Sequence, residues 1–229
     1  MNGLSHIIPQ FAVWILPVII AVTMHEAAHG YMAKLLGDKT AYMMGRVSLN
    51  PLKHVDPVGT LLLPAICLLT PGGFLLGYAK PVPVNFGALR HPRRDTVLVA
   101  LAGPGINVIL AILSLAALHF MPYVPVSGQS WTLHNLVNSA QINLILAVFN
   151  MLPIPPLDGG RVLVSILPRN LAIPLAQFET KAVILILVAI IFLPMLGQTV
   201  GINLNIFDWL VGRPANWLLQ NFAHLVGIG

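Results

Sequence analysis

Two histidines and a glutamate stand at the end of an apolar stretch near the start of the chain. Residues 7–24 carry no charged side chain, and His25, Glu26 and His29 come next. Positions i and i+4 of a helix share one face, so the two imidazoles can bind one cation. Glu26 points to a neighbouring face, from which its carboxylate can act on a water molecule at that cation. The spacing therefore predicts a metal site with a general base beside it.

The same histidines also have a structural interpretation, in which helix neighbours satisfy them in the core of a bundle. Ionisable groups at membrane depth are costly, and those that occur there commonly have a function. The apolar setting of His25 and His29 therefore favours the metal site. The other histidines lie in loops or near the ends of apolar runs, and we do not expect them to bind the metal.

The composition is typical of a membrane protein with several spans. Hydrophobic residues make up 57% of the chain and charged residues 8%, whereas soluble domains carry about 25% charged residues. The net charge of +5 does not indicate nucleic-acid binding, because the basic residues fall in loops between apolar runs. We predict an all-α polytopic membrane protein, a bundle of about four to six transmembrane helices.

The apolar runs divide the chain into the expected helices. These cover residues 11–36, 57–78, 96–121, 133–152 and 182–196, and residues 203–226 form a weak span or an interfacial amphipathic helix. We expect one membrane protease domain over residues 1–229, with a metal-site core at about 11–165 and C-terminal helices at about 171–229.

Lysine and arginine placement predicts the orientation in the membrane. They gather in residues 34–56, 78–94 and 161–181, and they are absent from 1–33 and 119–133. The positive-inside rule then puts the three basic segments in the cytosol. His25 precedes Lys34 by nine residues, which places it roughly 14 Å below the cytosolic charged boundary. We therefore expect the cell (inner or plasma) membrane as the location, with the active site toward the cytosol.

Three segments near that cytosolic side have two interpretations each. Residues 57–78 lie between basic loops, which favours a re-entrant hairpin, and the alternative is an ordinary span that violates the charge rule. Residues 45–51 and 80–85 have the pattern of short β-strands. Such an edge could capture an unwound substrate by β-augmentation, and the alternative is a plain surface loop.

Asp158 is the best candidate for the third ligand that a catalytic metal site needs. Pro153, Pro155 and Pro156 break the preceding helix near its cytosolic end, so the chain there should line a cavity. Asp158 would emerge near the depth of the histidines; it could also cap a helix, and one carboxylate can do both. Most other acids, including Asp38 and Asp95, lie in basic segments, where solvated ion pairs are expected.

These motifs together resemble the signature of the site-2 protease family of intramembrane zinc metalloproteases. The matching elements are His25-Glu26-x-x-His29, Asn150-x-x-Pro153-x-Pro155-x-x-Asp158-Gly159 and Gly103-Pro104-x-x-Asn107. Residues 45–51 and 80–85 are similar to those of its compact bacterial branch, without a PDZ or CBS domain. The resemblance extends from about residue 13 to 161. No span is expected before the one that carries His25, unlike the fuller family pattern.

The resemblance implies one Zn²⁺ per chain, bound by His25, His29 and Asp158. It implies further that Glu26 activates the water molecule. In this family pattern Asn150, and secondarily Asn107, would hold the substrate carbonyl or the oxyanion.

Both asparagines also have structural alternatives. Asn150 could make an interhelical hydrogen bond, and Asn107 could be satisfied across a helix interface next to Gly103 and Gly105.

The function predicted on this basis is that of an intramembrane zinc metalloendopeptidase. Its partners would be a transmembrane or signal-peptide-like substrate and the lipid bilayer, without nucleic acid. One alternative is a non-hydrolytic zinc-binding chaperone or pseudoprotease, against which the intact Glu26 argues. A metal or proton transporter is the other; it should have polar groups on both sides of the membrane midplane, and here they concentrate near one side.

Overall fold

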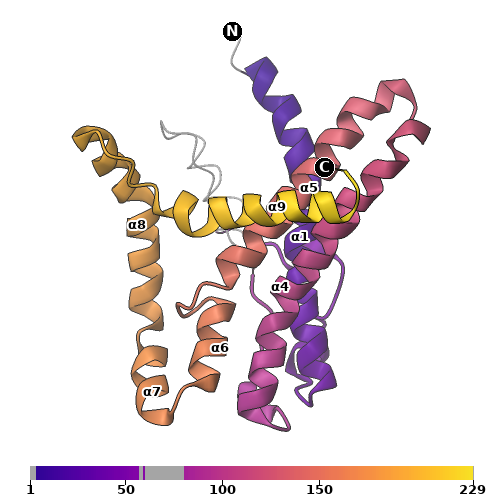
Figure 1. The fold of residues 1–229 in the computed structure, drawn as a ribbon. Coiled ribbons are helices and arrows are strands. Elements are labelled where there is room, and N and C mark those ends of the chain that lie inside the picture. Colours follow the sequence, from indigo (N-terminus) through magenta and orange to yellow (C-terminus); the bar gives the residue numbers. More distant parts are fainter. Residues whose placement is uncertain (1–3, 57–58, 60–79, 229) are drawn as a thin grey trace.

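Three long helices form the centre of the molecule (Figure 1). The computed structural model describes residues 4–56, 59 and 80–228, and it is mostly helical. Helices α1 (Leu4–Leu35), α4 (Pro92–Ala117) and α5 (Val126–Asn150) all pack against one another. Small side chains allow this close approach. Those that are fully buried include Ala21, Ala111 and Ala140.

The remaining elements surround this three-helix core. Helix α6 (Asp158–Ile166) packs on α4, and α7 (Arg169–Gln177) leads to α8 (Glu179–Val200), which stands to one side in Figure 1. The π-helical turn η5 (Asp208–Gly212) precedes α9 (Arg213–Leu225), which runs across α5. The short elements are α2 (Thr40–Met43), η1 (Pro51–Lys53), η3 (Phe86–Ala88) and η4 (Leu118–Tyr123).

The helices match the apolar runs of the sequence in part. Among the described residues, two helical stretches are long and apolar enough to cross a membrane, Val13–Leu35 and Pro92–Tyr123. Helix α5 begins at Val126, several residues before the predicted 133–152 run. The predicted hairpin at 57–78 lies, apart from Gly59, outside the described residues.

The prediction of short β-strands is wrong for the part of the chain that the structure describes, which contains no strand. Residues 80–85 form no regular element, and the N–H groups of Val82 and Asn85 bond to side chains. The N–H of Val82 donates to Glu26 Oε2 at 2.7 Å, and the N–H of Asn85 donates to Asp38 Oδ2 at 2.7 Å. Pro81 and Pro83 have no N–H to offer a ladder. The segment is therefore anchored to Glu26 of α1 and to Asp38, just after α1, rather than paired with another strand.

Asp38 and Asp95 are buried, in contrast to the solvated role expected from their basic surroundings. They are 1% and 2% exposed. Asp38 Oδ1 accepts the N–H of Thr40 at 2.8 Å, and Asp95 Oδ2 accepts the N–H of His91 at 2.8 Å. Burial raises the pKa of the Asp38 carboxyl, but the hydrogen bonds from Thr40 and Asn85 outweigh burial and hold this pKa below its usual value. Both carboxylates thus organise the ends of helices.

Candidate metal centre

His25 and His29 lie one turn apart on α1 and direct their Nε2 atoms to the same point. The two Nε2 atoms are 3.0 Å apart, and the rings meet edge to face. Asp158, the first residue of α6, brings its Oδ2 to 3.3 Å from each Nε2. The three residues are only 8%, 7% and 5% exposed. The structure therefore brings together the three side chains that the sequence predicted as metal ligands.

The far nitrogen of each ring faces an oxygen atom. His29 Nδ1 is 2.7 Å from the backbone oxygen of Val99 on α4, and His25 Nδ1 is 2.5 Å from Asn107 Oδ1 on the same helix. A carbonyl oxygen only accepts, so each Nδ1 must carry the hydrogen. In a neutral imidazole the other nitrogen, Nε2, then keeps its lone pair. Both lone pairs point toward Asp158.

Three acceptor atoms thus crowd together without a hydrogen between them. Asp158 Oδ2 is buried, and no described group donates a hydrogen bond to it. Protonating both rings would give the carboxylate two hydrogen-bond donors, but it would place the two positively charged Nε2–H groups against each other, with the nitrogens 3.0 Å apart. A bound cation satisfies all three atoms at once.

Zinc fits this donor set. With Zn–N and Zn–O bonds of about 2.0–2.2 Å, tetrahedral ligand atoms lie roughly 3.3–3.5 Å from one another. The observed separations of 3.0 and 3.3 Å are close to that spacing. Three protein ligands also leave a fourth position for water or substrate, as in catalytic zinc sites.

Glycines allow the backbone to approach the site from two sides. A Cβ at Gly103 of α4 would overlap Nε2 of both His25 and His29. At Gly159 and Gly160, a Cβ would overlap the backbone of the preceding loop, residues 151–155. The start of α6 therefore rests directly on this loop, and that contact sets the position of Asp158.

Glu26, the predicted general base, is half-buried beside the two ligands. One of its oxygens, Oε2, is held by the N–H of Val82, as described above. Arg46 supports the same segment, because its Nη2 donates to the carbonyl oxygens of Lys80 at 2.8 Å and Pro81 at 3.3 Å. Sequence reasoning missed this support for Glu26; the two prolines that leave few free N–H groups were the available signal.

The two predicted oxyanion residues have different surroundings. Asn150 is the last residue of α5, and its Nδ2 donates to the carbonyl of Leu146 one turn earlier, at 3.0 Å. Asn107 is fully buried, and its Nδ2 donates to Asn143 Oδ1 at 2.7 Å and to the backbone oxygen of Ala21 at 3.3 Å. Its amide hydrogens are committed, so the interface interpretation of Asn107 is favoured.

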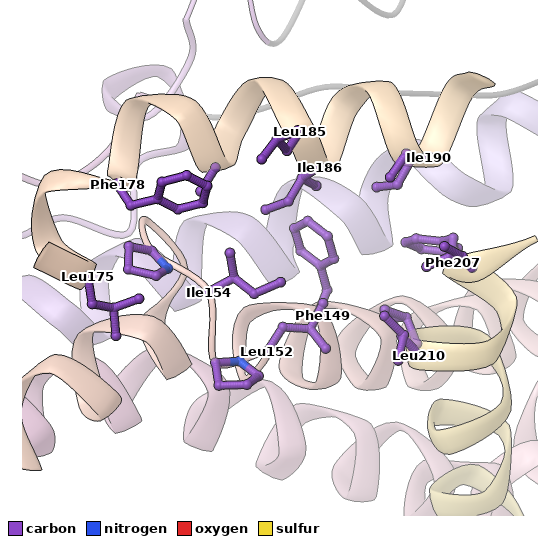
Figure 2. A pocket seen from close by; sticks show the side chains of 16 residues that line it. Phe149, Leu152, Ile154, Leu175, Phe178, Leu185, Ile186, Ile190, Phe207 and Leu210 are labelled. Atoms are coloured by element: carbon purple, nitrogen blue, oxygen red, sulfur yellow. The ribbon is translucent and has the colours of Figure 1, made fainter. Parts of the chain in front are cut away.

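An apolar pocket borders the loop that leads to Asp158. It has a volume of about 410 Å³ and lies between α8, the 152–155 loop and the region of η5. Figure 2 shows Phe149, Ile154, Ile186 and Phe207 among the side chains around it. An apolar pocket next to the ligand loop is suited to apolar side chains rather than to polar solutes.

A family comparison agrees with this geometry. The sequence model of the family described as peptidase family M50 matches residues 13–129 and 125–194, a range that includes all three candidate ligands. The chain belongs to peptidase family M50. The resemblance to site-2 proteases, drawn from the histidine motif and from the Asn150–Asp158 motif, is thereby confirmed. The M50 chain is a zinc metalloprotease by family.

The names of two relatives of this M50 protein agree with the family assignment. YwhC of Bacillus subtilis (strain 168) is 38% identical over 190 residues, which cover 81% of this chain and 82% of YwhC. Rip2 of Mycobacterium tuberculosis (strain H37Rv) is 30% identical over 190 residues, or 83% of this chain and 71% of Rip2. Both carry the name "putative zinc metalloprotease". Among solved structures, none matches the chain at a significant level.

Proposed function

We propose that this M50 protein is an intramembrane zinc endopeptidase that hydrolyses peptide bonds in transmembrane or signal-peptide-like segments. The observation that carries the proposal is the convergence of His25 Nε2, His29 Nε2 and Asp158 Oδ2, three buried acceptor atoms 3.0 to 3.3 Å apart. Two of these ligands belong to a helix that is long and apolar enough to span a membrane. The peptide bond would therefore be cut within the bilayer.

The chain's own residues divide the chemistry between them. A zinc ion held by the three ligands would polarise the scissile carbonyl and lower the pKa of a water molecule to about 7. Glu26 would take the proton of that water and later deliver it to the leaving amine. The Val82 N–H holds Oε2 of Glu26, which leaves Oε1 as the atom that exchanges the proton. Asn150 would donate to the oxyanion after its amide turns away from Leu146.

A groove beside the metal motif is suited to an unwound substrate segment. It is bordered by Ala27, Ala28 and Tyr31 of α1 and by residues 47–49 of the following loop. A helical substrate hides its carbonyls in i→i−4 hydrogen bonds, so it must unwind before cleavage. The apolar lining of this groove and of the pocket in Figure 2 supports a substrate segment with apolar side chains.

The proposed location is the cell membrane, crossed several times, with the metal centre toward the cytosol. This orientation is supported by the lysines and arginines, which gather in segments 34–56, 78–94 and 161–181. Helix α1 ends at the first of these segments, and helix α4 begins at the second.

The decisive experiment compares wild type with Glu26→Gln in proteoliposomes that contain a tagged single-span substrate. Wild type should cleave, and a zinc chelator should stop it. Glu26→Gln should keep its zinc, because the substitution spares the ligands, and lose activity by about 10²–10⁴-fold. Cleavage by Glu26→Gln at the wild-type rate would contradict the proposed role of Glu26. Zinc binding by a wild type that cuts no substrate would favour the non-hydrolytic alternative.

A further inference from the structure

A line of hydrogen-bonded polar side chains leads away from the metal centre through the three-helix core. It starts at His25 and continues through Asn107, Asn143 and Ser139 to Ser114. Asn107 and Asn143 are fully buried. Buried amides are costly unless their groups are satisfied, and neither the ligand set nor the proton transfer described above uses Asn143.

The backbone oxygen of Ser139 determines the direction of the hydrogen bonds between Asn143 and His25. Asn143 Nδ2 lies 2.8 Å from the backbone oxygen of Ser139. A backbone oxygen can only accept, so Asn143 must turn its NH₂ group toward Ser139. Its Oδ1 therefore faces Asn107 and can only accept from it, at 2.7 Å.

The orientation of Asn143 in turn determines the orientation of the Asn107 amide and the tautomer of His25. Asn107 must present its NH₂ group to Asn143 Oδ1, and the backbone oxygen of Ala21 requires the same orientation. Asn107 Oδ1 then faces His25 Nδ1, which must be the protonated nitrogen. Nε2 of His25 is thereby left with its lone pair, as a metal ligand needs.

The two histidine ligands differ in how firmly the tautomer with a hydrogen on Nδ1 is fixed. His29 bonds to the backbone oxygen of Val99, which cannot rotate. His25 bonds to a side-chain amide, and a flip of the Asn107 amide would reverse the tautomer of His25. A flipped Asn107 would, however, place its oxygen against Asn143 Oδ1 and the oxygen of Ala21. Asn143 supplies one of the two contacts that oppose the flip.

We infer that Asn143 is a positioning residue, which fixes the tautomer of His25 through the Asn107 amide and so keeps Nε2 available for the metal. The inference rests on the proposed zinc site, but it does not require that the substrate be a transmembrane segment. It predicts that zinc affinity depends on a side chain two hydrogen bonds away from the ligand.

The test compares Asn143→Leu with Asn138→Leu in the full chain. Asn138 lies on the same helix, and its Nδ2 also donates to a backbone oxygen, that of Val13 on α1 at 3.1 Å, without a link to His25. Asn143→Leu should weaken zinc binding about 10-fold, the lower end of the range for groups that support a ligand. Asn138→Leu should bind zinc as wild type does. Affinity is measured by competition with a chromophoric chelator.

A spectroscopic readout separates positioning from general packing. The ¹⁵N shifts of the zinc-free wild type should show a protonated Nδ1 in both His25 and His29. In Asn143→Leu the His25 signals should move toward a mixture of tautomers, and the His29 signals should not. If leucine prevents folding, Asn143→Ala removes the same acceptor with less bulk.

Several results would overturn the inference. These are an Nε2–H tautomer of His25 in the wild type, an unchanged tautomer and zinc affinity in Asn143→Leu, or an equal loss of affinity in both leucine variants. Failure of the proposed function gives a different result. If Asn143→Leu changes the tautomer and the zinc affinity as expected but the wild type cleaves no substrate, only the protease proposal fails.

Discussion

A single glycine determines how closely α4 approaches the two imidazoles. Glycine inside a helix is less favourable than alanine by about 0.5–1 kcal/mol, so Gly103 needs a compensating reason. That reason is the overlap that a Cβ would make with Nε2 of His25 and of His29. The neighbouring Gly105 is different, because no described atom beyond its chain neighbours and the nearby backbone of α4 lies within 4 Å of a Cβ placed there.

We therefore expect opposite effects from the same substitution at two positions of α4. Gly103→Ala should lower zinc affinity about 100-fold, because the methyl group occupies the space between the ligands. Gly105→Ala should leave zinc affinity unchanged and raise the free energy of unfolding by about 0.5–1 kcal/mol. Chelator competition and thermal unfolding in detergent measure the two effects. Equal zinc affinity in both variants would mean that Gly103 does not shape the site.

The sequence predicts residues of the site best where spacing alone decides the geometry. The i, i+4 spacing of His25 and His29 fixes a shared helix face, and the prolines before Asp158 mark a turn that leaves the helix. The partners of Asn107 were beyond such reasoning. They depend on which face of α4 meets α1 and α5, and Asn143 lies 36 positions away along the chain. An asparagine inside an apolar run is the signal that could have pointed to it.

At the scale of elements, segment 80–85 shows why the strand prediction failed. Its alternation and its prolines are typical of an edge strand. Local pattern does not reveal that Glu26 and Asp38 of the neighbouring helix region provide the acceptors for its N–H groups. The long helices were easier to predict, because an apolar run of sufficient length has few alternatives.

The carboxylate of Asp38 should make the stability of this region depend on pH. Its pKa in the folded protein is lower than the unfolded value of about 3.9. Its contribution to stability is therefore complete above that value and is lost as the pH falls through the lower, folded pKa. Asp38→Asn should lower the free energy of unfolding at pH 7 by about 1.5–3 kcal/mol, because hydrogen bonds to a charged group are lost. The variant should also lose less stability than wild type on acidification below pH 4.

Asp208→Asn provides the matched control for Asp38→Asn. Asp208 pairs with Arg213 at 3.2 Å, but both side chains are substantially exposed. Asp208→Asn should therefore lower the free energy of unfolding by less than about 1 kcal/mol. Thermal unfolding of the three proteins between pH 7 and pH 3 makes the comparison. If Asp38→Asn follows the wild-type acid profile, its carboxylate does not anchor residues 80–85 in the way proposed.

The metal centre lies nearer one end of the three-helix core, and this asymmetry matches the charge distribution of the whole molecule. Helix α4 begins beside a basic segment, and the stretch Pro92–Tyr123 ends at a connection that has no lysine or arginine between residues 119 and 133. The rise of a helix over this length exceeds the hydrocarbon thickness of about 30 Å. Its two ends should therefore face opposite aqueous compartments.

Single cysteines at those two ends test the orientation. In a Cys67→Ser background, Ala88→Cys and Ser127→Cys place thiols at exposed positions without changing the charge. An impermeant maleimide added to intact cells should label Ser127→Cys and should label Ala88→Cys only after the membrane is permeabilised. The reverse labelling pattern would show that the metal centre lies toward the outside of the cell. Labelling of both positions from one side would show that α4 does not span the membrane, and the substrate would then have to reach His25 and Asp158 from water.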